Sequence, residues 1–156
     1  MLATLLQDRT SLGVHEVEDK APIVPGNVYV APADYHLLIE PGHFSLSTDE
    51  PVRYSRPSID VTFVSAADTY GAKVIGVVLT GANADGSRGL KRIVDRGGMA
   101  FVQSPATAES ATMPTAAIRC VPQASVMAIG EIAAALTKLA SSPVEASSGA
   151  QAQAGP

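Results

Sequence analysis

The residues best suited to chemistry lie in a glycine-rich loop that follows the most apolar segment of the chain. Residues 74–79 (VIGVVL) form a continuous apolar run, and residues 80–89 (TGANADGSRG) come directly after it. A strand buried on both faces has this composition, and open α/β sheets carry their sites at the carboxyl ends of such strands. Small residues let a ligand approach the backbone, and amides at a helix start can stabilise an anion. Asp85 is the carboxylate of this loop.

Three interpretations of the loop compete. Gly81 and Gly86 have the spacing of a phosphate-binding G-x-x-x-x-G-K-[ST] loop, but Ser87 stands where that motif requires lysine. Asp85 could instead be a structural cap, because Asp-Gly turns often precede helices and the carboxylate accepts backbone amides. It could also be the orienting carboxylate of a catalytic triad, which holds a histidine in one tautomer. Spacing alone leaves all three open and favours the cap.

A triad also needs a serine and a histidine, and the sequence does not place such a pair. His15 lies in an acidic stretch and is expected to be exposed, whereas His36 is expected to be structural or at a rim, and His43 solvated. Ser58 and Ser87 are expected to cap helices. An activated serine needs a base within hydrogen-bonding reach, and no spacing in this chain assembles one.

The segments around the loop alternate between strand and helix. Ser58 is a good cap for a helix that ends before Gly71, and Pro41-Gly42 is the pair that a type II turn prefers. We expect helices over residues 2–7, 58–70, 87–96, 115–119 and 129–140, strands over 28–31, 74–79, 99–102 and 126–128, an extended run over 13–18, and a hairpin pairing 37–39 with 44–46.

This alternation predicts an α/β domain with a doubly wound, mostly parallel sheet and right-handed crossovers, into which the β-hairpin is inserted. Residues 1–140 are expected to form the domain. Residues 141–156 contain mainly Ser, Ala, Gly, Gln and Pro, and we expect a disordered tail.

Composition limits the partners. The chain has 156 residues and a formal net charge of -4, and it contains no Lys/Arg cluster, which argues against nucleic acid. Its one cysteine, Cys120, excludes an internal disulfide and a cysteine-rich metal site. No stretch approaches the roughly 18 apolar residues of a membrane span. We expect a cytoplasmic protein without membrane insertion, and no metal or organic cofactor is implied.

Several short motifs, in order, resemble the chemotaxis protein-glutamate methylesterases, the CheB family. Residues 56–63 (RPSIDVTF) resemble the family's R-P-S-x-D-x-x-F run, and residues 77–86 resemble its V-x-L-T-G-M-G-x-D-G loop. Residues 112–117 (TMPTAA) resemble its G-M-P-x-x-A segment. Residues 25–32, together with His36, resemble its P-G-x-x-Y-x-A-P…H stretch. The resemblance covers about residues 1–140.

The resemblance implies a serine hydrolase that removes methyl esters from chemoreceptor glutamates and deamidates receptor glutamines. Asp85 matches the family's triad aspartate, and Gly81 and Ala82 match the region beside its oxyanion site. Met113 falls in a segment near the site, and Arg56 either pairs with a carboxylate or contacts substrate. The implied partner is the cytoplasmic domain of a methylated chemoreceptor, and many members carry a regulatory receiver domain upstream.

The chain also departs from the family. It contains no G-x-S-x-G turn, and the family's catalytic histidine precedes the helix that residues 2–7 match. We therefore expect the C-terminal two-thirds of the family's domain, with exposed strand edges that make the isolated chain associate. Ala82, Asn83 and Thr112 replace a methionine and two glycines of the family pattern. The alternatives are a non-catalytic receptor-binding or assembly module, and an unrelated small-molecule binder that uses the 81–86 loop.

Overall fold

A three-stranded parallel sheet forms the C-terminal half of the computed structural model, which describes residues 1–141. Strands β5 (Ile75–Val78), β6 (Met99–Gln103) and β7 (Ser125–Met127) lie in the order β5-β6-β7. Helices α3 (Ser87–Asp95) and α4 (Thr112–Cys120) form the two crossovers, and α5 (Ile129–Ala140) follows β7. Short 3₁₀ turns, η1 (Gly71–Lys73) and η2 (Pro105–Thr107), precede β5 and follow β6.

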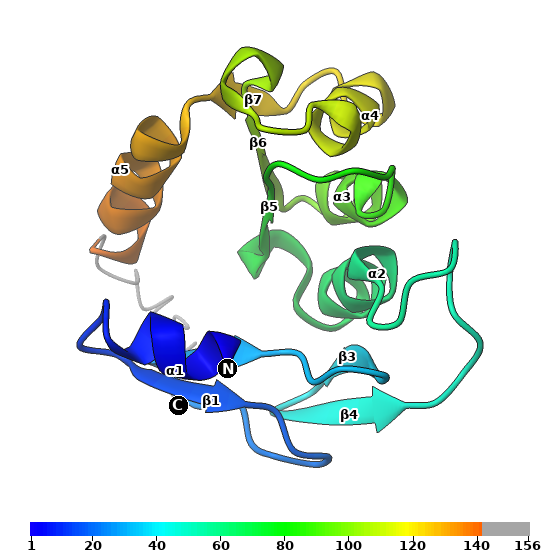
Figure 1. Cartoon of the computed structure of the whole chain (residues 1–156), viewed down its shortest axis with the longest axis vertical. Helices are drawn as coiled ribbons and strands as arrows, with labels where there is room; N and C mark the ends of the chain where they lie inside the picture. Colours follow the sequence, from blue (N-terminus) through cyan, green and yellow to red (C-terminus); the bar gives the residue numbers. More distant parts are fainter. Residues whose placement is uncertain (142–156) are drawn as a thin grey trace, which may run out of the picture.

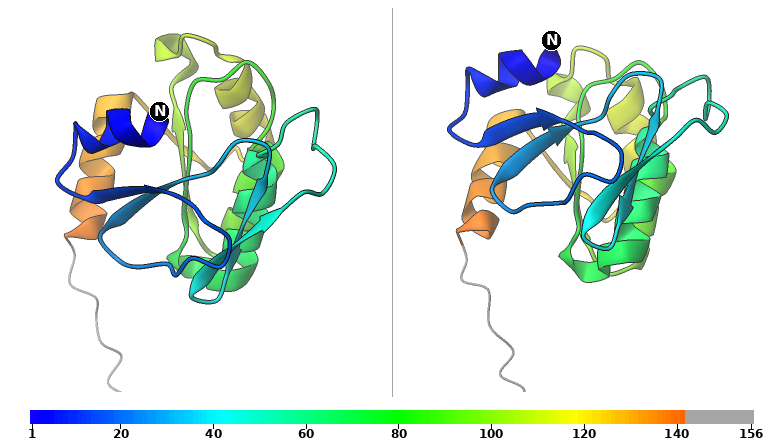
Figure 2. Two further views of the ribbon diagram at one scale, coloured as in Figure 1. Left: turned by 60° about the horizontal axis from the view of Figure 1, so that its bottom comes forward. Right: turned by 90° about the horizontal axis from the view of Figure 1, so that it is seen from below.

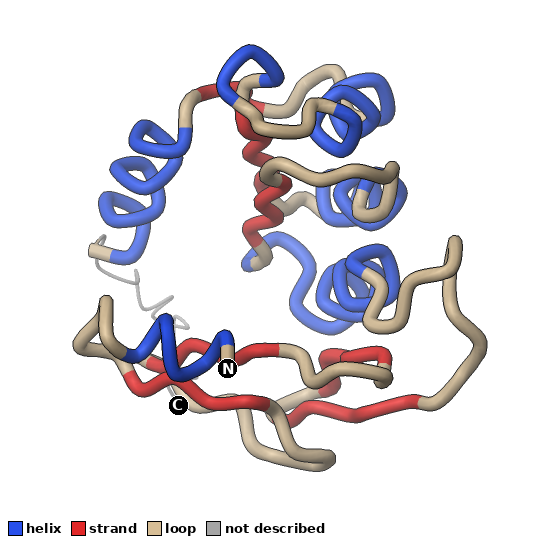
Figure 3. The backbone as a smooth tube through the Cα atoms, in the orientation of Figure 1, coloured by secondary structure: helices blue, strands red, loops and turns tan. Residues whose placement is uncertain are grey.

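Helices lie on both sides of this sheet. Figure 1 shows α2 (Ile59–Tyr70), α3 and α4 stacked on one side and α5 on the other, and Figure 3 shows the strands between them. Apolar side chains of the two layers interlock between β5, β6, α3 and α4. This core consists of Val78, Leu90, Ala100, Val102, Met113, Ala117 and Val121, with Ile59 and Phe63 of α2 packed against it.

The hairpin is bound to the rest of the domain through α2. Strands β3 (His36–Glu40) and β4 (His43–Ser47) pair antiparallel, and Figure 2 shows them beside α2. Thr62 donates to the carbonyl of Leu37 at 2.7 Å, the Ser65 hydroxyl accepts from the amide of Ile39 at 2.9 Å, and Thr69 donates to the carbonyl of Ile39 at 2.9 Å. Hydroxyls on one face of α2 thus satisfy an otherwise open strand edge.

The N-terminal segment adds a small sheet of its own. Helix α1 (Leu2–Gln7) leads into β1 (Gly13–Glu16), which pairs in parallel with β2 (Asn27–Val30). A second apolar cluster, formed by Val17, Leu37 and Phe44, connects this region to the hairpin.

The sequence predicted the fold class, and the structure confirms an α/β domain with a parallel sheet and an antiparallel hairpin. Strand ends differ from the predictions by one residue: the run 74–79 forms a strand only over Ile75–Val78. The predicted helix 115–119 begins earlier, at Thr112, because Pro114 in the first turn has no intrahelical amide bond to lose. The predicted disordered tail, apart from Ser141, lies outside the described residues. Within residues 1–141, every helix is too short or too polar to cross a membrane.

Candidate active site

Asp85 lies just beyond the carboxyl end of β5, and its carboxylate is buried, with 3% of the residue exposed. Oδ1 accepts hydrogen bonds from the Ser58 hydroxyl and from the amide of Asp60, both at 3.0 Å. Oδ2 accepts the amide of Ile59 at 2.7 Å. The carboxylate therefore caps a helix, as one interpretation of the sequence predicted, but the helix is α2 and not the α3 that follows it.

Asp60 makes the reciprocal contact. This residue lies in the first turn of α2 and is 7% exposed, and its Oδ1 accepts the amide of Gly89 in the first turn of α3 at 2.7 Å. Asp85, which precedes α3, thus satisfies free amides at the start of α2, and Asp60, in α2, satisfies a free amide at the start of α3. The helix dipole also favours negative charge at both helix starts. The two contacts fix the relative position of the α2 and α3 N-termini, and with it the position of Asp85.

Ser58 and His36 complete the buried surroundings of Asp85. The amide of Ser58 donates to Nδ1 of His36 at 3.2 Å, so Nδ1 carries no proton, and Nε2 donates to the carbonyl of Glu50 at 3.0 Å. The Ser58 hydroxyl donates to Asp85 and accepts the amide of Val61 at 3.5 Å. Serine, histidine and aspartate are thus adjacent, but the histidine bonds the serine's amide and the serine is 1% exposed. The arrangement holds Asp85 in place and is not a catalytic triad.

The loop that carries Gly81 is held by β6 and by the segment before α4. The amide of Thr80 donates to the Gln103 side chain at 2.9 Å. The amide of Gly81 donates to the carbonyl of Ser110 at 3.2 Å, and its own carbonyl accepts the amide of Met113 at 3.0 Å. Because its amide is used, Gly81 is not a free oxyanion donor. The neighbouring Ala82 is exposed, and its amide has no hydrogen-bond partner among residues 1–141.

The side chain of Met113 packs against this loop at Gly81. Met113 was expected in a segment near the site; it lies in the first turn of α4, and 9% of the residue is exposed. A Cβ atom on Gly81 would lie 2.6 Å from the methyl carbon of Met113, so a larger residue at position 81 would require the Met113 side chain to move. Met113 therefore helps to fix the position of the Gly81–Ala82 backbone by packing against it.

Arg56 lies two residues before Ser58 but forms no hydrogen bond or ion pair with Asp85. Its guanidinium donates to the backbone carbonyls of Thr48 at 3.0 Å and Asp49 at 3.3 Å. Among residues 1–141, no carboxylate forms an ion pair with it, in contrast to one sequence expectation. Arg56 thus anchors the segment between β4 and α2, and its buried Nε is left without a partner.

Ser87 also differs from expectation, because Gly86 is the N-cap of α3. Ser87 is the first residue of the helix, and its hydroxyl donates to the carbonyl of Ala84 at 3.0 Å. The side chain therefore closes the turn that follows Asp85 and does not cap the helix.

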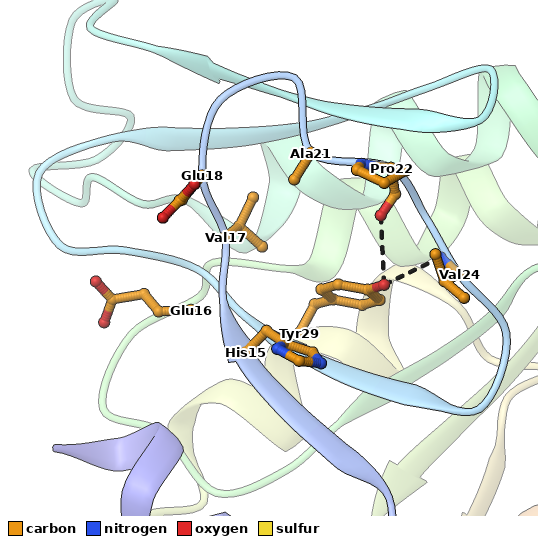
Figure 4. Close-up of a pocket in the computed structure, with 8 residues that line it drawn as sticks. All are labelled: His15, Glu16, Val17, Glu18, Ala21, Pro22, Val24 and Tyr29. Atoms are coloured by element: carbon orange, nitrogen blue, oxygen red, sulfur yellow. Dashed lines mark hydrogen bonds between the residues drawn. The ribbon is translucent and has the colours of Figure 1, made fainter.

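The other two histidines form no hydrogen bond with Asp85. His43 bonds the carbonyl of Pro41 at 3.2 Å and is half-buried, so it is less solvated than expected. Exposed His15 bonds the Asn27 side chain at 3.0 Å and lines a hollow of about 340 Å³ beside Tyr29 (Figure 4). The Tyr29 hydroxyl donates to the carbonyl of Pro22 and accepts the amide of Val24 at one side of that hollow.

Within the described part of the chain, no group of three His, Cys, Asp or Glu side chains could hold a metal ion.

The sequence predicted that Asp85 could cap a helix or orient a histidine, but it did not predict which residues bond its carboxylate. Ser58 and Asp60 were assigned only to their own helix, and no local pattern connects them to residues 25 or more positions away. The available signal was that each of the two Asp residues lies close to a helix start: Asp60 two positions after Ser58, and Asp85 directly before Gly86. When two such helices are neighbours, the carboxylate near each helix start can accept amides from the start of the other helix.

Comparison with known proteins assigns the chain to a family. The family model described as CheB methylesterase matches residues 1–136. A Leptospira interrogans protein (strain Fiocruz L1-130), whose provisional name is protein-glutamate methylesterase/protein-glutamine glutaminase, is 48% identical over 136 residues, which cover 86% of this chain and 70% of that protein. The protein-glutamate methylesterase FrzG of Myxococcus xanthus is 40% identical over 136 residues, which cover 86% of this chain and 41% of FrzG.

A solved structure shows the same fold. The crystal structure of the Thermotoga maritima CheB methylesterase catalytic domain superposes with a TM-score of 0.85 at 32% identity. The match covers 88% of this chain and 75% of the Thermotoga chain. These likenesses are inconsistent with an unrelated origin for the 81–86 loop. The chain belongs to the CheB methylesterase family.

Proposed function

We propose that this chain supplies the orienting carboxylate and the substrate loop of a protein-glutamate methylesterase. Such a site hydrolyses glutamate methyl esters on the cytoplasmic domain of a chemoreceptor, in the cytoplasm, and deamidates receptor glutamines. The observation that carries the proposal is Asp85: a buried carboxylate at the carboxyl end of β5, held by three donors beside an exposed loop. The names of the relatives supply the reaction.

The carboxylate has room for one more donor. An ionised carboxylate offers about four acceptor positions, and the three contacts from α2 use two on Oδ1 and one on Oδ2. The position left on Oδ2 can accept the ring N–H of a histidine. An imidazole held there keeps one tautomer, takes the proton of an attacking serine and passes it to the leaving methoxide, which departs as methanol.

That histidine is not one of the three in this sequence. His36 uses both ring nitrogens on backbone groups, and His15 and His43 are bonded elsewhere. Ser58 is too buried to attack an ester. The serine and the histidine of the reaction must therefore come from polypeptide other than the residues described here. We expect the chain by itself to release no methanol.

The Ala82 amide is the oxyanion donor that this chain can contribute. It belongs to an exposed residue and is unbonded within residues 1–141, while Met113 and Ser110 fix the backbone on its N-terminal side. A backbone amide keeps this ability whatever its side chain, so the replacement of the family's methionine by Ala82 does not remove the donor.

A second candidate function is a non-catalytic module that binds the receptor or assembles with it. It is favoured by the same finding, that no histidine of this chain reaches Asp85, and by the replacements at Ala82, Asn83 and Thr112. In this case the Asp85 contacts serve only to join α2 and α3.

A chimaera separates the two candidates. This chain would replace the matching part of the Leptospira relative, whose remaining residues supply the rest of the domain. Methanol release from a methyl-esterified receptor fragment would be measured, with Asp85→Asn as the matched variant. Release that depends on Asp85 supports the methylesterase. A chimaera that unfolds cooperatively, binds the receptor fragment and releases no methanol supports the binding module.

A further inference from the structure

The outer faces of α2 and α3, on the side away from the sheet, carry a continuous groove. One part, of about 500 Å³, lies between α2 and the segment that leads from β4, and its apolar lining is Leu38, Val52, Val61 and Val64. A second part, of about 410 Å³, shares Val64 and Arg88 with the first and continues along α3 to Cys120 of α4. Figure 1 shows these helices side by side, with the β4–α2 segment beyond them. We call this surface the α2–α3 groove.

The groove follows the axes of both helices. On α2 it is lined by residues 61, 64, 65 and 68, and on α3 by residues 88, 91, 92 and 95, which is the i, i+3, i+4, i+7 spacing of one helical face. Seven residues of helix rise about 10 Å, so the groove is two turns long. Val64 is 36% exposed, and Leu38, Val52 and Val61 are half-buried. Ridges at this spacing are the surface on which another helix packs.

The charges on the groove leave one cation without a partner. Asp68 is shared by Arg92 at 2.8 Å and Arg96 at 3.1 Å, and Lys91 pairs with Asp95 at 2.9 Å. Asp60 is buried and bonded to the Gly89 amide. Arg88 is exposed between the two parts of the groove, and no group among residues 1–141 bonds it. The other charged side chains of the groove are already paired, so Arg88 is the cation there that a carboxylate of a bound helix would meet.

We propose that the α2–α3 groove binds an acidic amphipathic helix of a partner protein. The apolar face of that helix, with residues at i, i+3 or i+4 and i+7, packs on Leu38, Val61 and Val64. A carboxylate beside that face pairs with Arg88, whose planar guanidinium can hold it with two hydrogen bonds. This interaction goes beyond ester hydrolysis and needs neither Asp85 nor the loop at Gly81.

The test is a titration of the full chain, labelled with nitrogen-15, by a synthetic helical peptide followed in amide NMR spectra. The probe is about 15 residues long, the length at which an isolated helix becomes marginally stable, and carries Leu at i, i+4 and i+7 with flanking Glu. We expect amide shifts at residues 61–65 and 88–92, binding that weakens with added salt, and loss of binding when the Glu residues are replaced by Gln.

Two groove variants and one control locate the site. Val64→Asp and Arg88→Glu are each expected to raise the Kd of the probe about tenfold, equivalent to about 1.4 kcal/mol. Lys73→Glu makes the same charge change as Arg88→Glu at an exposed residue outside the groove, and it should leave the Kd within about twofold. Both side chains are solvent-accessible, so each variant is expected to fold. Unchanged amide spectra outside the substituted helix would show that it does.

Three results would overturn the proposal. The first is the absence of peptide-dependent shifts in the groove, and the second is peptide binding that maps to another surface. The third is a set of groove shifts that change with the concentration of the chain alone, which would make a second copy the occupant. Activity of the chimaera has no bearing on any of them, so failure of the methylesterase proposal and failure of this one are distinguishable.

Discussion

At the scale of single residues, two aspartates hold the site, because each one bonds the start of the helix next to the other. Asp85, in the loop after β5, accepts the amides of α2, and Asp60, in α2, accepts an amide of α3. Both carboxylates are buried, so each bond replaces water that the helix start would otherwise need. Removing either acceptor leaves buried amides unpaired.

Asp60→Ala should therefore destabilise the fold. The Gly89 amide loses its acceptor at 2.7 Å in a buried environment, and an unsatisfied buried donor costs about 1–3 kcal/mol. Urea unfolding of the chain would measure the change. Asp8→Ala is the control, because Asp8 is exposed and surface substitutions usually change stability by less than about 0.5 kcal/mol. Equal stability of the two variants would show that the reciprocal contact is unimportant.

Ser58→Ala removes the hydroxyl that joins Asp85 to the start of α2. Loss of a helix cap costs about 0.5–2 kcal/mol, and this one also leaves Oδ1 of Asp85 with a single donor. In the chimaera described above, we expect a lower kcat with little change in KM, because the carboxylate is less well oriented. A change confined to unfolding, with kcat unaltered, would limit Ser58 to a structural role.

At the scale of elements, the close approach of α2 and α3 is the feature that brings Asp60 and Asp85 to their partners. A Cβ atom on Gly89 would lie 2.4 Å from Cβ of Phe63 and 3.1 Å from Cα of Asp60. The second of these atoms belongs to the main chain of a helix and cannot rotate away. Glycine at this position is therefore a requirement of helix packing.

Gly89→Ala should destabilise the protein by about 1–3 kcal/mol, because the two helices must separate. Gly130→Ala is a matched control in α5: nothing lies within 4 Å of the added methyl group. There the substitution should stabilise the chain by about 0.4–1 kcal/mol through loss of unfolded-state freedom. Thermal unfolding of both variants would check the opposite signs, and a stabilising Gly89→Ala would contradict the packing argument.

The ion pairs between α2 and α3 predict a pH dependence. The pKa of Asp68 is held below its ordinary value of 3.8, chiefly because the Arg92 side chain donates to it. A carboxylate with a lowered pKa in the folded state adds stability above its unfolded pKa and loses it as the pH falls through the folded value. The stability difference between wild type and Asp68→Asn should thus be present near pH 6 and shrink below about pH 4. Urea unfolding across this range would test it, and a constant difference would contradict it.

Sequence patterns predicted helices more accurately than strands and pairings. The helices over 2–7 and 129–140 were predicted at their observed bounds, and Ser58 was correctly placed as the cap of α2, because caps and apolar periodicity are local. The parallel pairing of β1 with β2 was not predicted. It spans the turn-rich segment between Glu16 and Asn27 and depends on the apolar cluster around Val17, which only the folded chain assembles. For the same reason the sequence predicted that Asp85 could cap a helix, but not that the capped helix is α2.

At the scale of the whole molecule, the β5 edge of the central sheet is open within residues 1–141. β5 pairs with β6, and within residues 1–141 no strand pairs with its other edge. Ile75 and Leu79, in and after this strand, are 37% and 40% exposed. An apolar edge with free backbone groups invites pairing with another chain.

The purified chain should therefore associate as its concentration rises. Ile75→Lys should reduce this association, because charged side chains on an edge strand oppose strand pairing. Sedimentation velocity over a range of concentrations would measure both. A monomer that unfolds sharply, reversibly and independently of concentration would contradict the prediction.

The most direct test of the account is the release of methanol by the chimaera with the Leptospira relative. We predict that the chimaera hydrolyses a methyl-esterified receptor fragment, and that Asp85→Asn lowers kcat by up to about 10⁴-fold, the loss seen when a triad aspartate is neutralised, while the chimaera still unfolds cooperatively. Equal methanol release by the chimaera and its Asp85→Asn variant, or none from a folded chimaera, would contradict the assignment of Asp85 as the orienting carboxylate.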